Sequence, residues 1–177
     1  MKKLTHEEIL NLRLTNEQAL STERNPITLI IDNVRSLYNV GSIFRTSDSA
    51  LIKELILCGF TPHPPRKEIE KTALGATESV PWQYFKNTSE AIAYAKLNNN
   101  KVIAVEITNS GRKYTSLKLD DFPLTLVVGN ELVGLSNEVL ELCDEAIEIN
   151  MYGVKHSLNV AVATGIVLFE ALRVYNK

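Results

Sequence analysis

Short apolar runs alternate with helix-like patterns along most of the chain. Continuous runs of β-branched and aliphatic residues predict buried strands, over residues 27–31, 55–58, 102–107, 124–129 and 146–149. Apolar residues at helical spacing predict helices between and after them, over about residues 39–51, 67–74, 87–96, 136–143 and 157–174. Strands that are apolar throughout, rather than alternating, are typical of a parallel sheet covered by helices on both faces. The predicted fold class is therefore α/β.

A polar segment precedes the first predicted strand. Thr5 and Glu8 have the spacing of a capping box, in which each side chain accepts a hydrogen bond from the other residue's backbone N–H. The pattern predicts one helix from there to about Leu20. We interpret residues 1–25 as an N-terminal helical extension and residues 26–177 as one α/β domain.

The last predicted helix is apolar on nearly all sides, and Ser157 stands where its N-cap is expected. A helix of this kind is buried on most of its surface. A second subunit is the favoured cover, and packing wholly inside one monomer is the alternative.

Composition and charge exclude several classes of protein. The chain has 177 residues, 45% hydrophobic and 23% charged, which are globular values and exclude disorder. The net charge of −2 excludes a broadly basic nucleic-acid wrapper, so any contact with RNA has to use a local patch. No apolar run approaches the roughly 18 residues of a membrane helix, and Glu7 and Glu8 interrupt any signal peptide.

The cysteines and histidines point to a reducing compartment and no metal. Cys58 and Cys143 both lie in apolar contexts, which predicts buried packing rather than a disulfide. We therefore expect a cytoplasmic protein. The histidines have no spacing typical of metal ligands, so no metal site is predicted.

Three polar segments follow predicted strands, each with a glycine before or within a helix start. Ligands of open α/β sheets bind at the carboxyl ends of the strands. In the first segment, residues 33–46, Asn39 and Arg45 are six residues apart on one helix, and Gly41 lets another group approach the backbone. The alternative for Arg45 is a surface arginine whose stem covers the core.

In the second segment, residues 127–136, two glycines bracket Asn130 and Glu131. A plain strand-to-helix turn is the alternative. The third segment, residues 149–159, places Lys155 and His156 near a helix start, which suits a phosphate, and Asn159 at a position where it is a poor helix former. None of the three contains a dinucleotide fingerprint, a P-loop or a nucleophile elbow.

Taken together, the three segments resemble the motifs of the SpoU (TrmH-type) family of RNA 2′-O-ribose methyltransferases in the SPOUT superfamily. The matching patterns are N-x-G-x-x-x-R-T at 39–46, G-N-E-x-x-G-L-S at 129–136 and I-x-M-x-G-x-x-x-S-L-N-V at 149–160. The resemblance extends over about residues 27–173. One departure is Asn150, where the family often has proline, and this could loosen a cofactor loop.

The resemblance implies a C-terminal deep trefoil knot, S-adenosylmethionine as the cofactor, and a homodimer formed through the last helix. It also makes residues 26–177 the catalytic domain. The implied reaction is methyl transfer to a ribose 2′-hydroxyl of tRNA or rRNA. We favour tRNA slightly, because many relatives carry a separate RNA-binding domain and this chain has only the short N-terminal extension. A non-catalytic RNA-binding or assembly module that retains the fold is the alternative, and the missing phosphate-binding loop disfavours a flavodoxin-like nucleotide binder.

The resemblance also assigns roles to residues by their place in the motifs. The catalytic candidates are Asn39, Arg45, Glu131, Ser157 and Asn159. The cofactor-binding candidates are Val128, Gly129, Asn130, Glu131, Ile149, Met151, Ser157 and Leu158. Arg45 is cast either as a general base or as a clamp for a phosphate, and the second role suits a guanidinium better because this group stays protonated in proteins.

Basic residues in or beside predicted loops are candidates for RNA contact, although any one of them is equally compatible with ordinary surface. They are Arg35, Arg45, Arg66, Lys67, Arg112 and Lys155. The aromatic residues Trp82, Tyr84 and Phe85 predict a core strand, with base stacking as the alternative.

Overall fold

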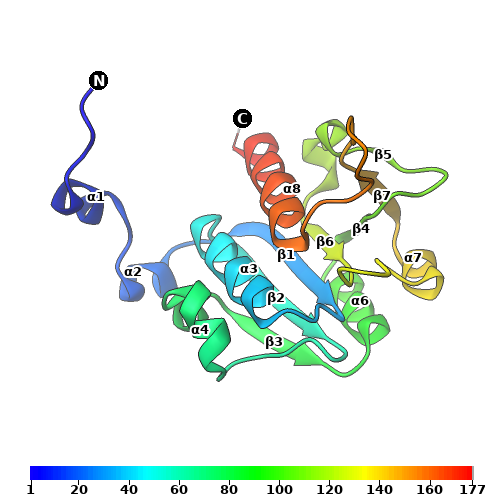
Figure 1. Ribbon diagram of the computed structural model, residues 1–177, viewed down its shortest axis with the longest axis horizontal. Coiled ribbons are helices and arrows are strands. Elements are labelled where there is room, and N and C mark those ends of the chain that lie inside the picture. Colours follow the sequence, from blue (N-terminus) through cyan, green and yellow to red (C-terminus); the bar gives the residue numbers. More distant parts are fainter. Residues whose placement is uncertain (177) are drawn as a thin grey trace.

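A parallel sheet of seven strands forms the centre of the computed structural model, which describes residues 1–176 (Figure 1). Its strand order is β3-β2-β1-β6-β4-β7-β5. The strands are β1 (Asn25–Asp32), β2 (Ile52–Cys58), β3 (Trp82–Phe85), β4 (Lys101–Val105), β5 (Arg112–Lys113), β6 (Leu124–Val128) and β7 (Glu145–Glu148). The α/β fold class is thus confirmed. The strand predicted from the aromatic segment is present as β3, but it lies at the sheet edge with Tyr84 exposed rather than in the core. Strand β5 is additional and lies within a stretch that has no apolar run.

Helices cover both faces of this sheet. They are α1 (His6–Leu12), α2 (Asn16–Ser21), α3 (Leu37–Ser49), α4 (Lys67–Ala73), α5 (Ala76–Ser79), α6 (Thr88–Leu97), α7 (Asn137–Leu142) and α8 (Val160–Tyr175). On one face, Leu29 and Ile31 of β1 belong to a core shared with α3, α4 and α8. On the other face, Ile30 packs into a second core with Ala91 and Ala95 of α6. Because both faces are covered, the strands are continuously apolar.

The N-terminal extension differs from the prediction of one helix. Thr15 and Gln18 form a second capping box, so α1 ends at Leu12 and a new helix begins after Thr15. Helix α1 buries no side chain and lies away from the sheet (Figure 1). The extension is attached at its end, where Arg24 donates hydrogen bonds to the backbone oxygens of Ala19 and Ile52.

The start of α8 also differs from the prediction, because Asn159 and not Ser157 is its N-cap. The Asn159 Oδ1 accepts hydrogen bonds from the backbone N–H groups of Ala161 (3.0 Å) and Val162 (3.3 Å). Ser157 therefore lies in the preceding loop. Helix α8 is covered by the core on one side only, since Val162 and Phe169 are 52% and 50% exposed.

No helix in residues 1–176 is long and apolar enough to cross a membrane. The trefoil knot stays a prediction from the family resemblance.

Candidate functional site

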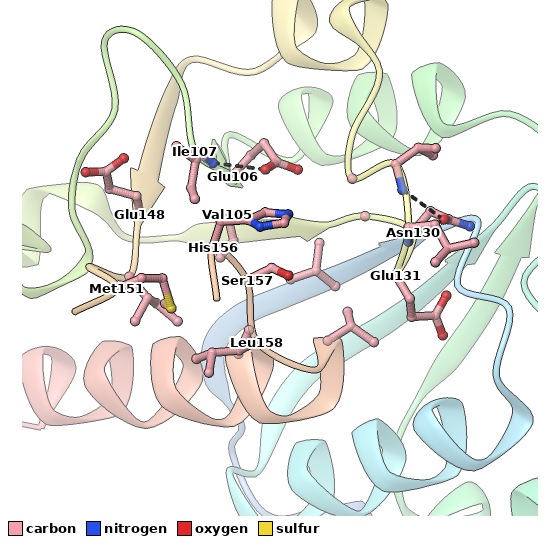
Figure 2. A pocket seen from close by; sticks show the side chains of 18 residues that line it. Val105, Glu106, Ile107, Asn130, Glu131, Glu148, Met151, His156, Ser157 and Leu158 are labelled. Atoms are coloured by element: carbon pink, nitrogen blue, oxygen red, sulfur yellow. Dashed lines mark hydrogen bonds between the residues drawn. The ribbon is translucent and has the colours of Figure 1, made fainter. Parts of the chain in front are cut away.

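A cavity of about 460 Å³ opens at the carboxyl ends of β4, β6 and β7 (Figure 2). The chain builds β1, β2 and β3 outward in one direction and then restarts on the far side of β6 with β4. Such a reversal in strand order leaves a crevice where ligands of α/β proteins bind. The volume lies in the range of sites for small organic molecules, roughly 300–1,000 Å³.

The loop after β6 forms one wall of the cavity and is tightly folded. Asn130 and Gly134 exchange backbone hydrogen bonds, and the Asn130 Oδ1 accepts from the backbone N–H of Leu132 at 2.8 Å. Gly134 has a φ of +66°, and a Cβ atom there would lie 2.2 Å from Glu106 Oε2. The same Glu106 oxygen accepts from the Leu135 N–H at 3.0 Å. The positive φ favours glycine at position 134, any larger residue would displace the Glu106 carboxylate, and that carboxylate fastens the loop to the end of β4.

Glu131 connects this loop to the start of α3. Its Oε2 accepts a hydrogen bond from the backbone N–H of Arg35 (2.9 Å), and its Oε1 accepts from the N–H of Ser36 (3.0 Å) and from Asn39 Nδ2 (2.9 Å). Burial raises the pKa of Glu131, but the hydrogen bonds from Arg35, Asn39 and Ser36 outweigh it, so the pKa lies below its usual value. Glu131 is thus a fixed, ionised carboxylate at neutral pH.

Asn159 joins the same network from the third segment. Its Nδ2 donates to Asn39 Oδ1 at 3.1 Å, while its own Oδ1 caps α8. Asn159 therefore uses both the oxygen and the nitrogen of its amide, which explains why asparagine, a poor helix former, stands at this position. Three of the predicted catalytic residues, Asn39, Glu131 and Asn159, form one hydrogen-bonded chain.

The other two catalytic candidates are placed differently. Arg45 lies six residues beyond Asn39 on α3 and is exposed. Within residues 1–176, its guanidinium makes no hydrogen bond or ion pair. Ser157 is exposed and lines the cavity.

The cofactor candidates named from the motifs all line this one cavity. Figure 2 shows Met151 and Glu148 at one end of it and Asn130 and Glu131 at the other. Among residues 1–176, no group of three or more histidine, cysteine or acidic side chains is arranged to hold a metal ion.

Several lining residues were not predicted. The end of β4 contributes Val105, Glu106 and Ile107, and the end of β7 adds Glu148. His156, noted above only for its place near a helix start, also lines the cavity. The sequence does mark Val105, Glu106 and Ile107, because the strand predicted over 102–107 also ends in a polar stretch. The pattern could not show that this strand lies beside the two that carry motifs.

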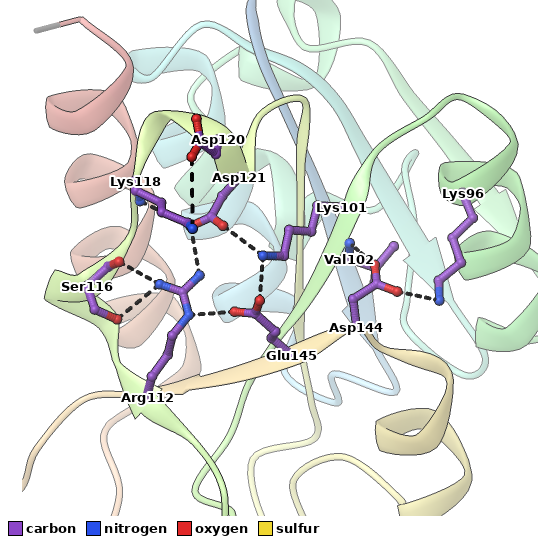
Figure 3. Close-up of polar contacts among 10 residues, drawn as sticks. All are labelled: Lys96, Lys101, Val102, Arg112, Ser116, Lys118, Asp120, Asp121, Asp144 and Glu145. Atoms are coloured by element: carbon purple, nitrogen blue, oxygen red, sulfur yellow. Dashed lines mark hydrogen bonds and ion pairs between the residues drawn. The ribbon is translucent and has the colours of Figure 1, made fainter.

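The basic residues predicted to contact RNA differ in whether their charged groups are available to a ligand. Arg35, Arg66, Lys67 and Lys155 are exposed. Arg112 instead belongs to an ion-pair network at the sheet edge (Figure 3). Its prediction as an RNA contact is corrected, because every guanidinium nitrogen is already used.

The Arg112 network is centred on a buried carboxylate. Arg112 Nε donates to Glu145 Oε2 (2.6 Å), Nη1 to the backbone oxygen of Ser116 (2.6 Å) and Nη2 to Asp121 Oδ2 (2.7 Å). Lys101 Nζ donates to Asp121 Oδ1 at 2.8 Å. Burial raises the pKa of Asp121, but its hydrogen bonds with Lys101 and Arg112 outweigh burial and hold the pKa below its usual value. The network connects β4, β5 and β7 and has a structural role.

A cavity at the carboxyl edge of a parallel α/β sheet, bounded by glycine-containing loops, defines a protein that binds a small organic ligand. The model of the SpoU rRNA Methylase family matches residues 26–169. The chain therefore belongs to this family, and the family resemblance is confirmed.

Two curated relatives show how far the similarity extends. The 23S rRNA (guanosine-2′-O-)-methyltransferase RlmB of Haemophilus influenzae is 33% identical over 157 residues, covering 89% of this chain and 63% of that protein. The tRNA (guanosine(18)-2′-O)-methyltransferase of Aquifex aeolicus is 31% identical over 169 residues, covering 93% of this chain and 78% of that protein. The chain thus spans less than two thirds of the length of the first relative.

Two solved structures have the same fold. The AdoMet-bound rRNA methyltransferase from Sinorhizobium meliloti matches with a TM-score of 0.79 and 31% identity, over 85% of this chain and 57% of that one. The TrmH/SpoU tRNA modifying enzyme of A. aeolicus matches with a TM-score of 0.81 and 30% identity, over 95% and 85%.

Proposed function

We propose that the protein is an S-adenosylmethionine-dependent RNA methyltransferase that modifies a ribose 2′-hydroxyl of tRNA or rRNA. The observation that carries the proposal is the chain of Asn39, Glu131 and Asn159, which comes from three distant segments and lies beside one ligand-sized cavity. The names of the relatives, a 23S rRNA methyltransferase and a tRNA methyltransferase, support both substrate classes. An interlocked set of this kind disfavours a module that retains only the fold.

The cavity suits S-adenosylmethionine chemically. Apolar side chains such as Val105, Ile149 and Leu158 offer contacts for an adenine ring, and the carboxylates of Glu106 and Glu148 favour a positively charged ligand. We assign the binding to the cavity residues predicted from the motifs, which are Val128, Gly129, Asn130, Glu131, Ile149, Met151, Ser157 and Leu158. When bound, the cofactor supplies a methyl group on a sulfonium, which is a good leaving group.

The protein's own residues would act mainly by alignment. Holding two reactants in the correct geometry can supply much of a rate enhancement. Glu131 fixes the start of α3, and α3 carries Arg45. We propose that Arg45 binds a phosphate next to the target ribose with a bidentate contact, because it is exposed and unpaired within residues 1–176 and a planar guanidinium matches this group.

The remaining assignments concern assembly. We propose a homodimer in which a second copy covers the exposed side of α8, including Val162 and Phe169. Residues 1–25 would form an extension and residues 26–177 the catalytic domain. The cysteines Cys58 and Cys143 are both free, which fits a protein of the cytoplasm.

The test is methyl transfer from labelled S-adenosylmethionine to total cellular RNA, separated into tRNA and rRNA. We expect label in one fraction, resistant to alkaline cleavage, and reduced roughly a hundredfold in Arg45→Ala because alignment is lost. Arg45→Lys separates the two roles of this residue, since retained activity would contradict a bidentate clamp. Cofactor binding without transfer to any RNA would favour a binding-only module, and the absence of cofactor binding would refute the assignment of the cavity.

A further inference from the structure

Aromatic side chains are exposed at the β3 edge of the sheet, away from the cavity. The His63 ring lies 6.2 Å from Trp82 in a stacked arrangement, and 5.2 Å from Tyr84 with the two ring planes tilted by 51°. Trp82 in turn packs edge-on against Phe44 in the core, with centroids 6.2 Å apart. His63 is exposed and Tyr84 is 43% exposed, so their outer surfaces face solvent. We call His63 and Tyr84 the aromatic platform.

The platform is held rigidly by the loop between β2 and α4. The Tyr84 hydroxyl donates to the backbone oxygen of Gly59 at 2.7 Å. The backbone N–H of Phe60 donates to Asn33 Oδ1 at 3.1 Å, and the hydroxyl of Thr61 accepts from the Val34 N–H at 3.0 Å. These hydrogen bonds restrain Tyr84 and the backbone just before His63, which lowers the entropy cost of ordering them when a ligand binds.

The platform lies at the same carboxyl end of the strands as the candidate site, but on the other side of β1. Strand register places Cys58 of β2 beside both Asp32 of β1 and Phe85 of β3, and Ile31 beside Val128 of β6. Three strand spacings of about 4.8 Å give roughly 14 Å between the ends of β6 and β3. That is about four steps of 3.4 Å along a stacked nucleic-acid strand.

Positive charge follows the platform in the chain. Arg66, Lys67 and Lys71 line an open hollow of about 440 Å³ together with Pro65 and Glu70. The Glu70 carboxylate accepts a hydrogen bond from the Thr77 hydroxyl (3.0 Å), and Glu68 is an exposed acidic side chain on the same helix. With three cations against the carboxylates of Glu68 and Glu70, the surroundings of the hollow carry a small net positive charge on a chain whose net charge is −2.

Exposed rings beside cations are the arrangement that single-stranded RNA requires, because every base has a face that stacks and every nucleotide a phosphate. We propose that neighbouring unpaired nucleotides of the substrate RNA, a few positions from the methylated ribose, stack on His63 and on Tyr84, one base on each ring, while Arg66 and Lys67 bind their phosphates. This inference rests on the proposed RNA methyltransferase function and names the RNA element that the protein reads beside its target.

The test compares variants of the full-length protein in binding a single-stranded RNA dodecamer that carries the fluorescent base 2-aminopurine. We expect wild type to quench the fluorescence by stacking. Tyr84→Ala and His63→Ala should each weaken binding by about fivefold to a hundredfold, the range for one lost base stack. Tyr84→Phe keeps the ring and should bind like wild type, although it loses the hydrogen bond to Gly59.

Matched controls are Tyr94→Ala, a 37% exposed tyrosine of α6 on the opposite sheet face, and Lys118→Gln. Both should leave RNA binding unchanged, whereas Arg66→Gln and Lys67→Gln should each reduce the slope of log affinity against log salt by about 0.7. Unchanged binding in Tyr84→Ala and His63→Ala, or equal loss in Tyr84→Phe and Tyr84→Ala, would overturn the proposal. So would a wild-type protein that does not bind the dodecamer.

Failure of the proposed function is distinguishable, because it would appear as absent S-adenosylmethionine binding or absent methyl transfer in wild type. If the wild type methylates RNA and the platform variants have the same KM for RNA, the proposed stacking on the platform is contradicted while the methyltransferase function stands. Circular dichroism and calorimetric titration with S-adenosylmethionine show whether each variant is folded.

Discussion

Replacing Glu131 tests whether its carboxylate holds the site together. The carboxylate accepts hydrogen bonds from the backbone N–H groups of Arg35 and Ser36 and from the Asn39 amide, at 2.9–3.0 Å. In Glu131→Gln, one oxygen can still serve Ser36 and Asn39, but the new NH₂ group faces the Arg35 N–H, so two donors meet. Glu131→Ala leaves all three donors without this partner.

The magnitude follows from these contacts. A hydrogen bond to a charged acceptor contributes about 1.5–3 kcal/mol. Arg35 is exposed, so water replaces part of the loss, and we expect the lower end, about 1.5 kcal/mol, for Glu131→Gln. For Glu131→Ala we expect about 3 kcal/mol, less than the sum of three bonds for the same reason.

Urea unfolding at neutral pH measures this difference. With a slope of about 2 kcal/mol per M, Glu131→Gln should lower the midpoint by about 0.7 M. Hydrogen exchange should become faster at the amides of Arg35 and Ser36, which the carboxylate protects. The control is Glu141→Gln, an exposed glutamate of α7 that should change stability by less than about 0.5 kcal/mol.

The pH dependence has a definite sign. The pKa of Glu131 lies below its ordinary value of 4.5 in the folded protein. Its contribution to the free energy of unfolding is therefore complete above about pH 4.5 and is lost as the pH falls through the folded value. The difference between wild type and Glu131→Gln should shrink in that acidic range. Equal midpoints at pH 7 together with equal amide exchange would refute the role of Glu131 as the fastening point.

Three further predictions concern stability and binding. Asp121→Asn leaves two cations without their buried partner and should lower the free energy of unfolding in urea by about 3 kcal/mol at pH 7. Because the folded pKa of Asp121 lies below 3.8, the difference from wild type should fade only as the pH drops under that value. A difference that stays constant with pH would contradict this. Gly134→Ala places a Cβ 2.2 Å from Glu106 Oε2 at a φ of +66°, so calorimetry should show weaker S-adenosylmethionine binding and a lower Tm, and unchanged values would count against the tight loop. Asn159→Ala removes the α8 cap and the hydrogen bond to Asn39 and should cost about 1 kcal/mol, or roughly 2–4 °C in Tm. Asn159→Asp keeps the cap oxygen but turns a second oxygen toward Asn39 Oδ1, so it should recover only part of this loss.

Local patterns were sufficient wherever neighbours in sequence decide the structure. The continuous apolar runs identified β1, β2, β4, β6 and β7, because strand segments buried on both faces are mainly apolar. Capping residues worked in the same way at Thr5 and Ser136, since the bond they form spans three residues. The second capping box at Thr15 has the same three-residue spacing and marks the start of α2, which the prediction of one continuous helix did not contain.

The contacts within the site could not be predicted from the motifs alone. The motifs named Asn39, Glu131 and Asn159 through resemblance, but which atoms meet depends on contacts between residues 92 and 120 positions apart. Glu106 carries no motif, and it lines the cavity only because β4 lies beside β6 and β7.

What the sequence determined by itself was most of the strands and helices, the parallel sheet and the family, since these depend on local composition and on residue order. The tertiary structure decided which charged groups are free. Arg112 and Arg45 are both arginines in polar surroundings, yet one is consumed by Asp121 and Glu145 and the other is exposed. Strand order brings those carboxylates to Arg112, and no pattern along the chain contains that order.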